Sequence, residues 1–156
     1  MCPNGSYIKL NSPSVEFLPT ADYSVEFWAK VPFDSQFAIT SPVDTFILEL
    51  IVESTVVRHR RSGMLMQPNI GDGSGSVVGR WVHAFAGRKS GIDYVACNGV
   101  MTSNSSNPYT LTSLADLYIG MFNYPGSPAY IQDLRYIVGD CAYTASFTPP
   151  AAPYTL

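Results

Sequence analysis

The stretch DYSVEFWAKV at residues 22–31 alternates between two kinds of side chain, and this alternation decides the fold class. Its apolar set comprises Val25, Phe27, Ala29 and Val31. The intervening positions are polar except for Trp28. Because successive side chains of a β-strand lie on opposite faces, the pattern predicts a strand with one face in the core. On the polar face, Trp28 is expected to lie under a covering loop or to line a groove.

Further strand-like runs follow along the chain, and no helix-length segment of 3.6-residue period separates them. They lie at residues 6–10, 37–40, 46–53, 55–59, 64–67, 77–87, 92–97, 117–120 and 130–138. Turn residues stand between them, and Asn98-Gly99 is the strongest signal because a type I′ turn needs positive φ at both positions. Ten or more short strands without helices predict an all-β fold of two antiparallel sheets packed as a sandwich.

The composition of the 156 residues favours one sheet-rich domain spanning residues 1–156. Charged residues make up only 13%, against about 25% in an average soluble domain, which disfavours helical bundles. The net charge is −3, and the only basic cluster lies at residues 58–61. A nucleic-acid-binding protein needs a basic surface that neutralises many phosphates, so no nucleic-acid partner is expected. We interpret the basic cluster as an exposed hairpin tip or a contact for an acidic partner.

The three cysteines are Cys2, Cys97 and Cys141, and none belongs to a CxxC pair. Two interpretations stay open, namely buried unpaired thiols and a single disulfide between Cys97 and Cys141. His59 and His83 are isolated from any cysteine pair, so no metal site or cofactor is predicted.

No secretion signal or membrane helix is expected from the sequence. The first residues have no apolar signal-peptide core, and no run reaches the roughly 18 apolar residues of a membrane helix, so no membrane partner is expected. Residues 1–5 are predicted to form an extended N-terminal arm. The Pro-rich tail at residues 148–156 is expected to lie over the surface or to reach a neighbour, since its prolines cannot pair in a sheet.

Several phrases, taken in order, resemble the laminin-G-like branch of the concanavalin A-like lectin/glucanase superfamily. They are YSVEFWAK at 23–30, GRWVHAFAGR at 79–88, DYVACNGV at 93–100, LYIG at 117–120, and YIQDLRY at 130–136 followed by AYTASFTPP at 142–150. The closing phrase is similar to laminin-G-like domains in structural proteins of tailed bacteriophages. The resemblance implies two antiparallel sheets in a flattened jelly roll, and a His83 that supports packing or a hydrogen bond.

The chemistry of the metal-binding and hydrolytic members is not expected here. In place of their acidic metal ligands stands Gln132-Asp133, and the six to eight oxygens that calcium requires cannot be assembled. The glucanases carry their carboxylates on one strand as ExDxE, whereas the nearest candidates here, Glu49 and Glu53, lie roughly 13 Å apart in a strand. That separation suits neither hydrolytic mechanism, so no catalytic residue is predicted.

Two non-enzymatic functions follow. The first is a virion structural protein of a tailed phage, either a capsid decoration (cement) protein or a head- or tail-fibre subunit, made in the host cytoplasm. Its partners would be a major capsid or tail protein, surface glycans, and further copies of itself in a trimer. The alternative is a carbohydrate-binding, lectin-like module. In both cases the expected contact residues are Trp28, Tyr109, Asn123 and Tyr124, because aromatic rings stack on sugars and polar groups bind hydroxyls.

Overall fold

The computed structural model describes residues 7–11, 22–30, 37–40, 49–52, 57–61, 64–66, 78–105, 116–120 and 130–151. Eleven strands lie within these residues. They are β1 (Tyr7–Asn11), β2 (Tyr23–Lys30), β3 (Phe37–Thr40), β4 (Glu49–Val52), β5 (Val57–Arg61), β6 (Met64–Met66), β7 (Trp81–Lys89), β8 (Ile92–Cys97), β9 (Val100–Asn104), β10 (Asp116–Gly120) and β11 (Tyr130–Val138). The described part contains no helix long and apolar enough to cross a membrane.

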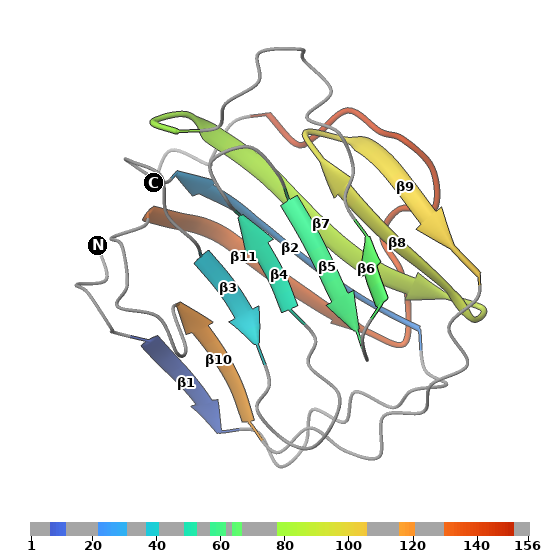
Figure 1. Ribbon diagram of the computed structural model, residues 1–156, viewed down its shortest axis with the longest axis horizontal. Coiled ribbons are helices and arrows are strands. Elements are labelled where there is room, and N and C mark those ends of the chain that lie inside the picture. Colours follow the sequence, from blue (N-terminus) through green and yellow to red (C-terminus); the bar gives the residue numbers. More distant parts are fainter. Residues whose placement is uncertain are drawn as a thin grey trace.

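The strands form two antiparallel sheets that pack face to face (Figure 1). The six-stranded sheet has the order β1-β10-β3-β4-β5-β6, and the five-stranded sheet has the order β11-β2-β7-β8-β9. Between the sheets, β4 lies against β7, β5 against β8, and β6 against β9. The predicted all-β sandwich of two antiparallel sheets is therefore confirmed.

The inner face of the five-stranded sheet is built from the apolar set that the sequence of β2 displays. Val25, Phe27 and Ala29 are at most 1% exposed. On the neighbouring strand β7, Phe27 lies opposite Ala84, so a large ring meets a small side chain. This alternation of large and small residues lets the face pack densely, which is what stabilises a sandwich core.

The hairpin between β8 and β9 has the turn that Asn98-Gly99 predicts. Asn98 has φ 48° and Gly99 has φ 80°, as a type I′ turn requires. Asn98 N donates to the carbonyl of His83 at 2.9 Å, while Asn98 Oδ1 accepts from His83 N at 3.0 Å. The sequence did not predict β9 itself, because VMTSN is an edge strand without an apolar row.

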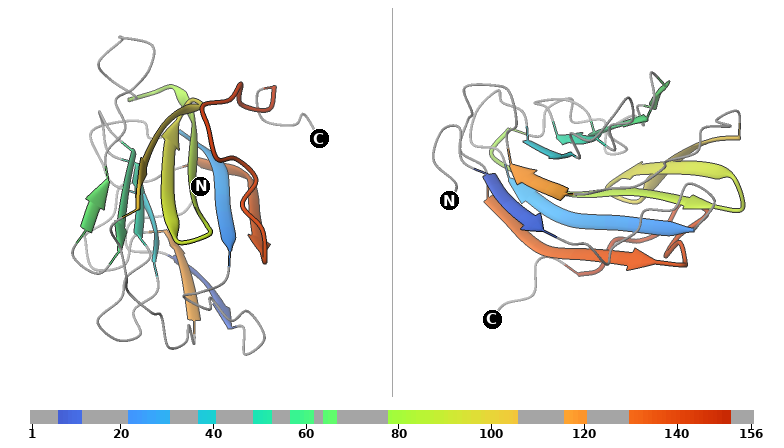
Figure 2. Two further views of the ribbon diagram at one scale, coloured as in Figure 1. Left: turned by 90° about the vertical axis from the view of Figure 1, so that its right-hand side faces the viewer. Right: turned by 90° about the horizontal axis from the view of Figure 1, so that it is seen from below.

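The outer face of the five-stranded sheet is covered by residues 140–150, here called the covering segment (Figure 2, left view). Under it lies a second hydrophobic cluster, distinct from the core between the sheets. Its members are Phe85, Tyr94, Ala96 and Cys141, packed against Ile92, Met101, Ala142, Tyr143 and Phe147. The sheet thus has apolar contacts on both faces. Residues 148–150 of the predicted tail belong to this segment, whereas residues 1–5 and 152–156 lie outside the described ones.

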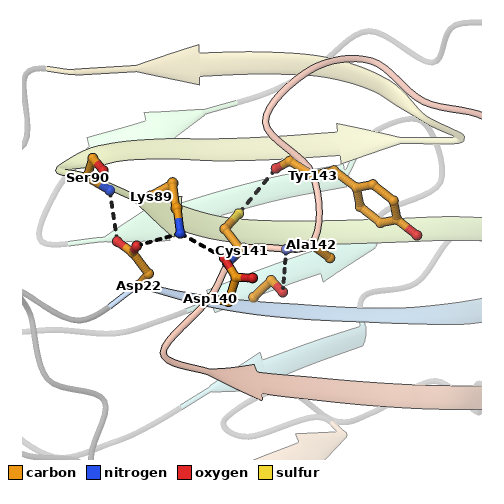
Figure 3. Close-up of polar contacts among 8 residues, drawn as sticks. Asp22, Lys89, Ser90, Asp140, Cys141, Ala142 and Tyr143 are labelled. Carbon is orange, nitrogen blue, oxygen red and sulfur yellow. Dashed lines mark hydrogen bonds and ion pairs between the residues drawn. The ribbon is translucent and has the colours of Figure 1, made fainter.

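The covering segment is attached at its start by polar contacts with β2 and β7 (Figure 3). Lys89 Nζ lies 2.8 Å from Asp140 Oδ1 and 3.0 Å from Asp22 Oδ2. Two residues further, Ala142 N donates to Ser24 Oγ at 3.2 Å. These contacts join parts of the chain that are far apart in sequence, so they fix the covering segment to the β2–β7 part of the sheet.

Two of the cysteines lie on opposite faces of the five-stranded sheet. Cys97 pairs in register with Ala84 and belongs to the inner face. Cys141 lies on the outer face beside Gly87, where an added Cβ would come within 2.6 Å of its Sγ. Both are buried and neither forms a disulfide, so the interpretation as thiols is confirmed for this pair over a Cys97–Cys141 disulfide. Burial raises the pKa of the Cys141 thiol to about 11, which keeps it protonated at neutral pH.

The basic cluster at residues 58–61 was wrongly interpreted as a hairpin tip. Val57–Arg61 is strand β5, paired with β4 on one side and β6 on the other. The last residue of β5, Arg61, pairs with Met64 of β6.

The contact between Gly99 and the covering segment can be tested by substitution. Gly99→Ala should destabilise more than Gly91→Ala, because a Cβ on Gly99 would lie 1.9 Å from the carbonyl oxygen of Phe147. Gly91 also has positive φ, but a Cβ added there would have no atom within 4 Å. Gly91→Ala should therefore lose only the cost of holding a residue other than glycine at positive φ, about 1–2 kcal/mol. Urea unfolding of both variants measures the difference. Equal losses would contradict the proposed contact.

Candidate functional site

A hollow of about 270 Å³ opens on the outer face of the five-stranded sheet, where the covering segment crosses β2, β7 and β11. It combines aromatic, acidic and basic side chains. The lining residues are Glu26, Trp28, His83, Asp133, Arg135, Tyr143 and Pro150. Strands supply five of them, and the covering segment supplies Tyr143 and Pro150.

Strand register brings the polar residues together. Glu26 and Trp28 occupy alternate positions on β2 and therefore share a face. His83 lies opposite Trp28 on β7, and Arg135 lies opposite Glu26 on β11. Between Gln132 and Arg135 the register shifts by one residue, which is a β-bulge. Asp133 in this bulge has φ 54°, so the bulge places both its carboxylate and Arg135 at the hollow.

Glu26 is the buried centre of the hollow. Its side chain is 6% exposed, and its Oε2 lies 3.1 Å from Nε2 of His83. This contact is close but not aligned as a hydrogen bond, so it is electrostatic. The other oxygen, Oε1, accepts from the guanidinium of Arg135. Burial raises the pKa of Glu26, but the contacts with His83 and Arg135 outweigh this effect and lower the pKa overall.

Arg135 links the carboxylate to the covering segment. Its side chain is 52% exposed, and Nη2 donates to the hydroxyl of Tyr143 at 3.4 Å. Burial lowers the pKa of Arg135, while the bond to Glu26 raises it by more. Both shifts favour the charged forms, so the pair is charged at neutral pH.

Aromatic rings form the walls of the hollow. Trp28 meets His83 edge to face at a centroid distance of 5.3 Å, and Phe147 also meets His83 edge to face at 5.7 Å. Tyr143 stacks on Phe147 with centroids 3.7 Å apart and the planes 5° from parallel. His83 Nδ1 is buried without a hydrogen-bond partner among the described residues. The imidazole therefore has mainly a packing and electrostatic role, consistent with the support expected of it.

The structure places one of the four predicted contact residues in the hollow. Trp28 lines it, as expected of an aromatic residue on the polar face of its strand. Tyr109, Asn123 and Tyr124 lie outside the described residues, so their role stays a prediction. Glu49 begins β4, where it pairs in register with Arg60, and Glu53 lies outside the described residues. Within the described part, no group of three or more His, Cys, Asp and Glu residues could hold a metal ion.

Sequence reasoning missed Glu26, Arg135 and Tyr143. Glu26 could have been found, since it stands two residues before Trp28 on the same polar face. Arg135 and Tyr143 could not, because a bulge and a segment without regular structure bring them to the hollow.

Neither the family models nor the curated proteins include a match to this chain. Solved structures do match over most of its length. The binding domain of botulinum neurotoxin serotype D aligns with a TM-score of 0.69 at 13% identity, covering 91% of this chain and 39% of that domain. The fold is that of the concanavalin A-like lectins and glucanases. The chain spans about two-fifths of the length of the neurotoxin domain that it matches.

Two alginate lyases share the same fold. The family 7 alginate lyase A1-II′, solved in complex with its substrate, has a TM-score of 0.60 at 12% identity, with 89% of this chain and 72% of the lyase covered. The alginate lyase from Alteromonas sp. 272 has a TM-score of 0.55 at 15% identity, with 86% and 79% covered. At these identities the likeness is one of fold, so the activity has to be argued from the hollow itself.

The ion pair of Glu26 should make part of the stability depend on pH. The folded-state pKa is lowered, so the unfolded chain binds the proton more tightly. The stabilisation is therefore present above the unfolded value of about 4.3 and is lost as the pH falls through the folded value. Glu26→Gln should lose about 3 kcal/mol near pH 7, because it leaves buried His83 and half-exposed Arg135 without their carboxylate.

The measurement is urea unfolding of both proteins between pH 7 and pH 3. The difference in the free energy of unfolding between wild type and Glu26→Gln should become smaller as the pH falls. Asp140→Asn serves as the control, since it removes an exposed ion pair and should change stability little. A gap that stays constant down to pH 3 would refute the assignment.

Proposed function

We propose that this concanavalin A-like domain is a non-catalytic carbohydrate-binding module, with the hollow beside Trp28 as its binding site. The observation that carries the proposal is the pairing of aromatic walls with hydrogen-bonding groups in one hollow. Sugars present an apolar ring face and a rim of hydroxyls, and a site that binds them needs both kinds of group. Trp28 and Tyr143 supply the rings, while Asp133 and Arg135 supply polar groups at the rim.

The size of the hollow favours a short ligand. Its volume of about 270 Å³ lies just below the roughly 300–1,000 Å³ of sites for drug-sized molecules. A single sugar ring or the end of a chain fits this volume better than a long internal stretch. We therefore expect recognition of one or two sugar rings.

The state of Glu26 supports binding over hydrolysis. A glycosidase needs one carboxyl group that stays protonated near neutral pH and donates its proton to the leaving group. The pKa of Glu26 is instead lowered by its partners, so it has no proton to give. The carboxylate holds Arg135 in position at the hollow, which is a structural role.

The virion function remains a prediction that rests on the resemblance to phage laminin-G-like domains. The alginate lyase matched above was solved with its substrate, so the fold accommodates a saccharide in that protein. This precedent, together with the hollow, favours the lectin-like alternative. The two functions remain compatible, since a virion subunit can carry a glycan-binding site.

A glycan array followed by fluorescence titration tests the proposal. The chain has two tryptophans, so Trp81→Phe leaves Trp28 as the single reporter. Trp81 does not line the hollow, and this variant should bind as the wild type does. In that background, a glycan found on the array should change the Trp28 emission.

Trp28→Ala should lower the affinity for the same glycan at least tenfold, because it removes the ring on which the sugar stacks. A tenfold loss equals about 1.4 kcal/mol. Isothermal titration calorimetry provides the readout, and circular dichroism confirms that the variant is folded. Undiminished binding by a folded Trp28→Ala variant would place the site elsewhere.

A further inference from the structure

We propose that the hollow selects neutral saccharides over acidic ones, such as uronic-acid or sulfated sugars. The inference rests on the proposed carbohydrate-binding function and assigns the ligand class of that same site. Its basis is the pairing of charges around Glu26. A site for an acidic sugar needs a cation that is available to the ligand, and both cationic candidates in the described lining already contact Glu26.

Arg135 is the first of these candidates. Both its Nε and its Nη2 contact Oε1 of Glu26, and Nη2 also donates to Tyr143. Bidentate binding of a ligand carboxylate needs two adjacent N–H groups of the fork, and the same edge is already used internally. The exposed half of the side chain can still donate single hydrogen bonds to sugar hydroxyls.

His83 is the second candidate, and its surroundings keep it from the ligand. The side chain is 2% exposed, with Nε2 directed at Glu26. Trp28 and Phe147 pack against the imidazole from two sides. A sugar in the hollow therefore contacts the aromatic side chains around His83. It makes no ion pair with the imidazole.

Asp133 adds the opposite charge at the rim. Together with Glu26 it gives the lining two carboxylates, against one permanent cation, Arg135. An anionic sugar would lose contacts with water and would meet the carboxylate of Asp133 at this lining. Like charges a few ångströms apart near a protein surface weaken binding by at least about fivefold. The hydroxyls of a neutral sugar have no such penalty. They can accept hydrogen bonds from Arg135 and donate them to Asp133.

The experiment compares two sets of hexasaccharides on the Trp81→Phe protein. Neutral probes are β-linked oligomers of glucose, mannose, xylose and N-acetylglucosamine, and acidic probes are oligomannuronate and a sulfated galactan of equal length. Neutral probes should bind, and acidic ones should bind at least fivefold more weakly in 0.15 M salt. Raising the salt to 0.5 M should reduce the difference, because screening weakens the repulsion.

Two variants test the charge argument directly. Asp133→Asn keeps a residue type that tolerates positive φ and removes one negative charge, so the ratio of acidic to neutral affinity should rise about fivefold. Asp140→Asn makes the same charge change at the start of the covering segment and should leave the ratio as it was. Glu26→Gln, if folded, should raise the ratio further because it releases the guanidinium of Arg135.

The outcomes separate the two proposals. Preference for neutral probes with the predicted response to Asp133→Asn supports both. Stronger binding of acidic probes overturns the ligand class while leaving the carbohydrate-binding function in place. Failure of every glycan on the array to bind overturns the function itself, and the ligand class with it. An unchanged ratio in both Asp133→Asn and Glu26→Gln would show that these carboxylates do not set the selectivity.

Discussion

A carboxylate removed from water is costly unless cations or donors surround it, and the outer face of the five-stranded sheet is arranged around this constraint. Glu26 on β2 draws His83 from β7 and Arg135 from β11 into contact with it. Arg135 in turn reaches Tyr143, so the covering segment joins the same network. The buried carboxylate of Glu26 is therefore linked by polar contacts to β7, β11 and the covering segment. The hollow lies between these elements.

The covering segment has two functions that depend on each other. Its aromatic residues close the second hydrophobic cluster over Phe85, and they also form a wall of the hollow. Phe147 packs against both Phe85 and His83. The position of this wall is therefore set by the packing of the hydrophobic cluster beneath it. If the hollow binds a sugar as proposed, a wall held by core packing would reduce the entropy lost on binding.

The fold could be predicted from local patterns because strands and turns are local. The alternation of apolar and polar residues in β2 and the turn at Asn98-Gly99 each depend only on residues adjacent in the sequence. The site could be predicted only as far as Trp28, which stands on a polar face. Arg135 reaches the hollow because β11 contains one extra residue, and Tyr143 because a chain without strand pairing crosses the sheet. Such tertiary features leave no periodic signal in the sequence.

The bulge in β11 has a consequence beyond the hollow. β11 is an edge strand of its sheet, and a long regular edge offers unpaired backbone groups to any other extended chain. The extra residue at Asp133 interrupts that row of groups in the middle of the strand. The same insertion that places Arg135 beside Glu26 thus makes the edge of the sheet a poorer template for strand addition, so the geometry of the hollow and the protection of the edge share one irregularity of the backbone.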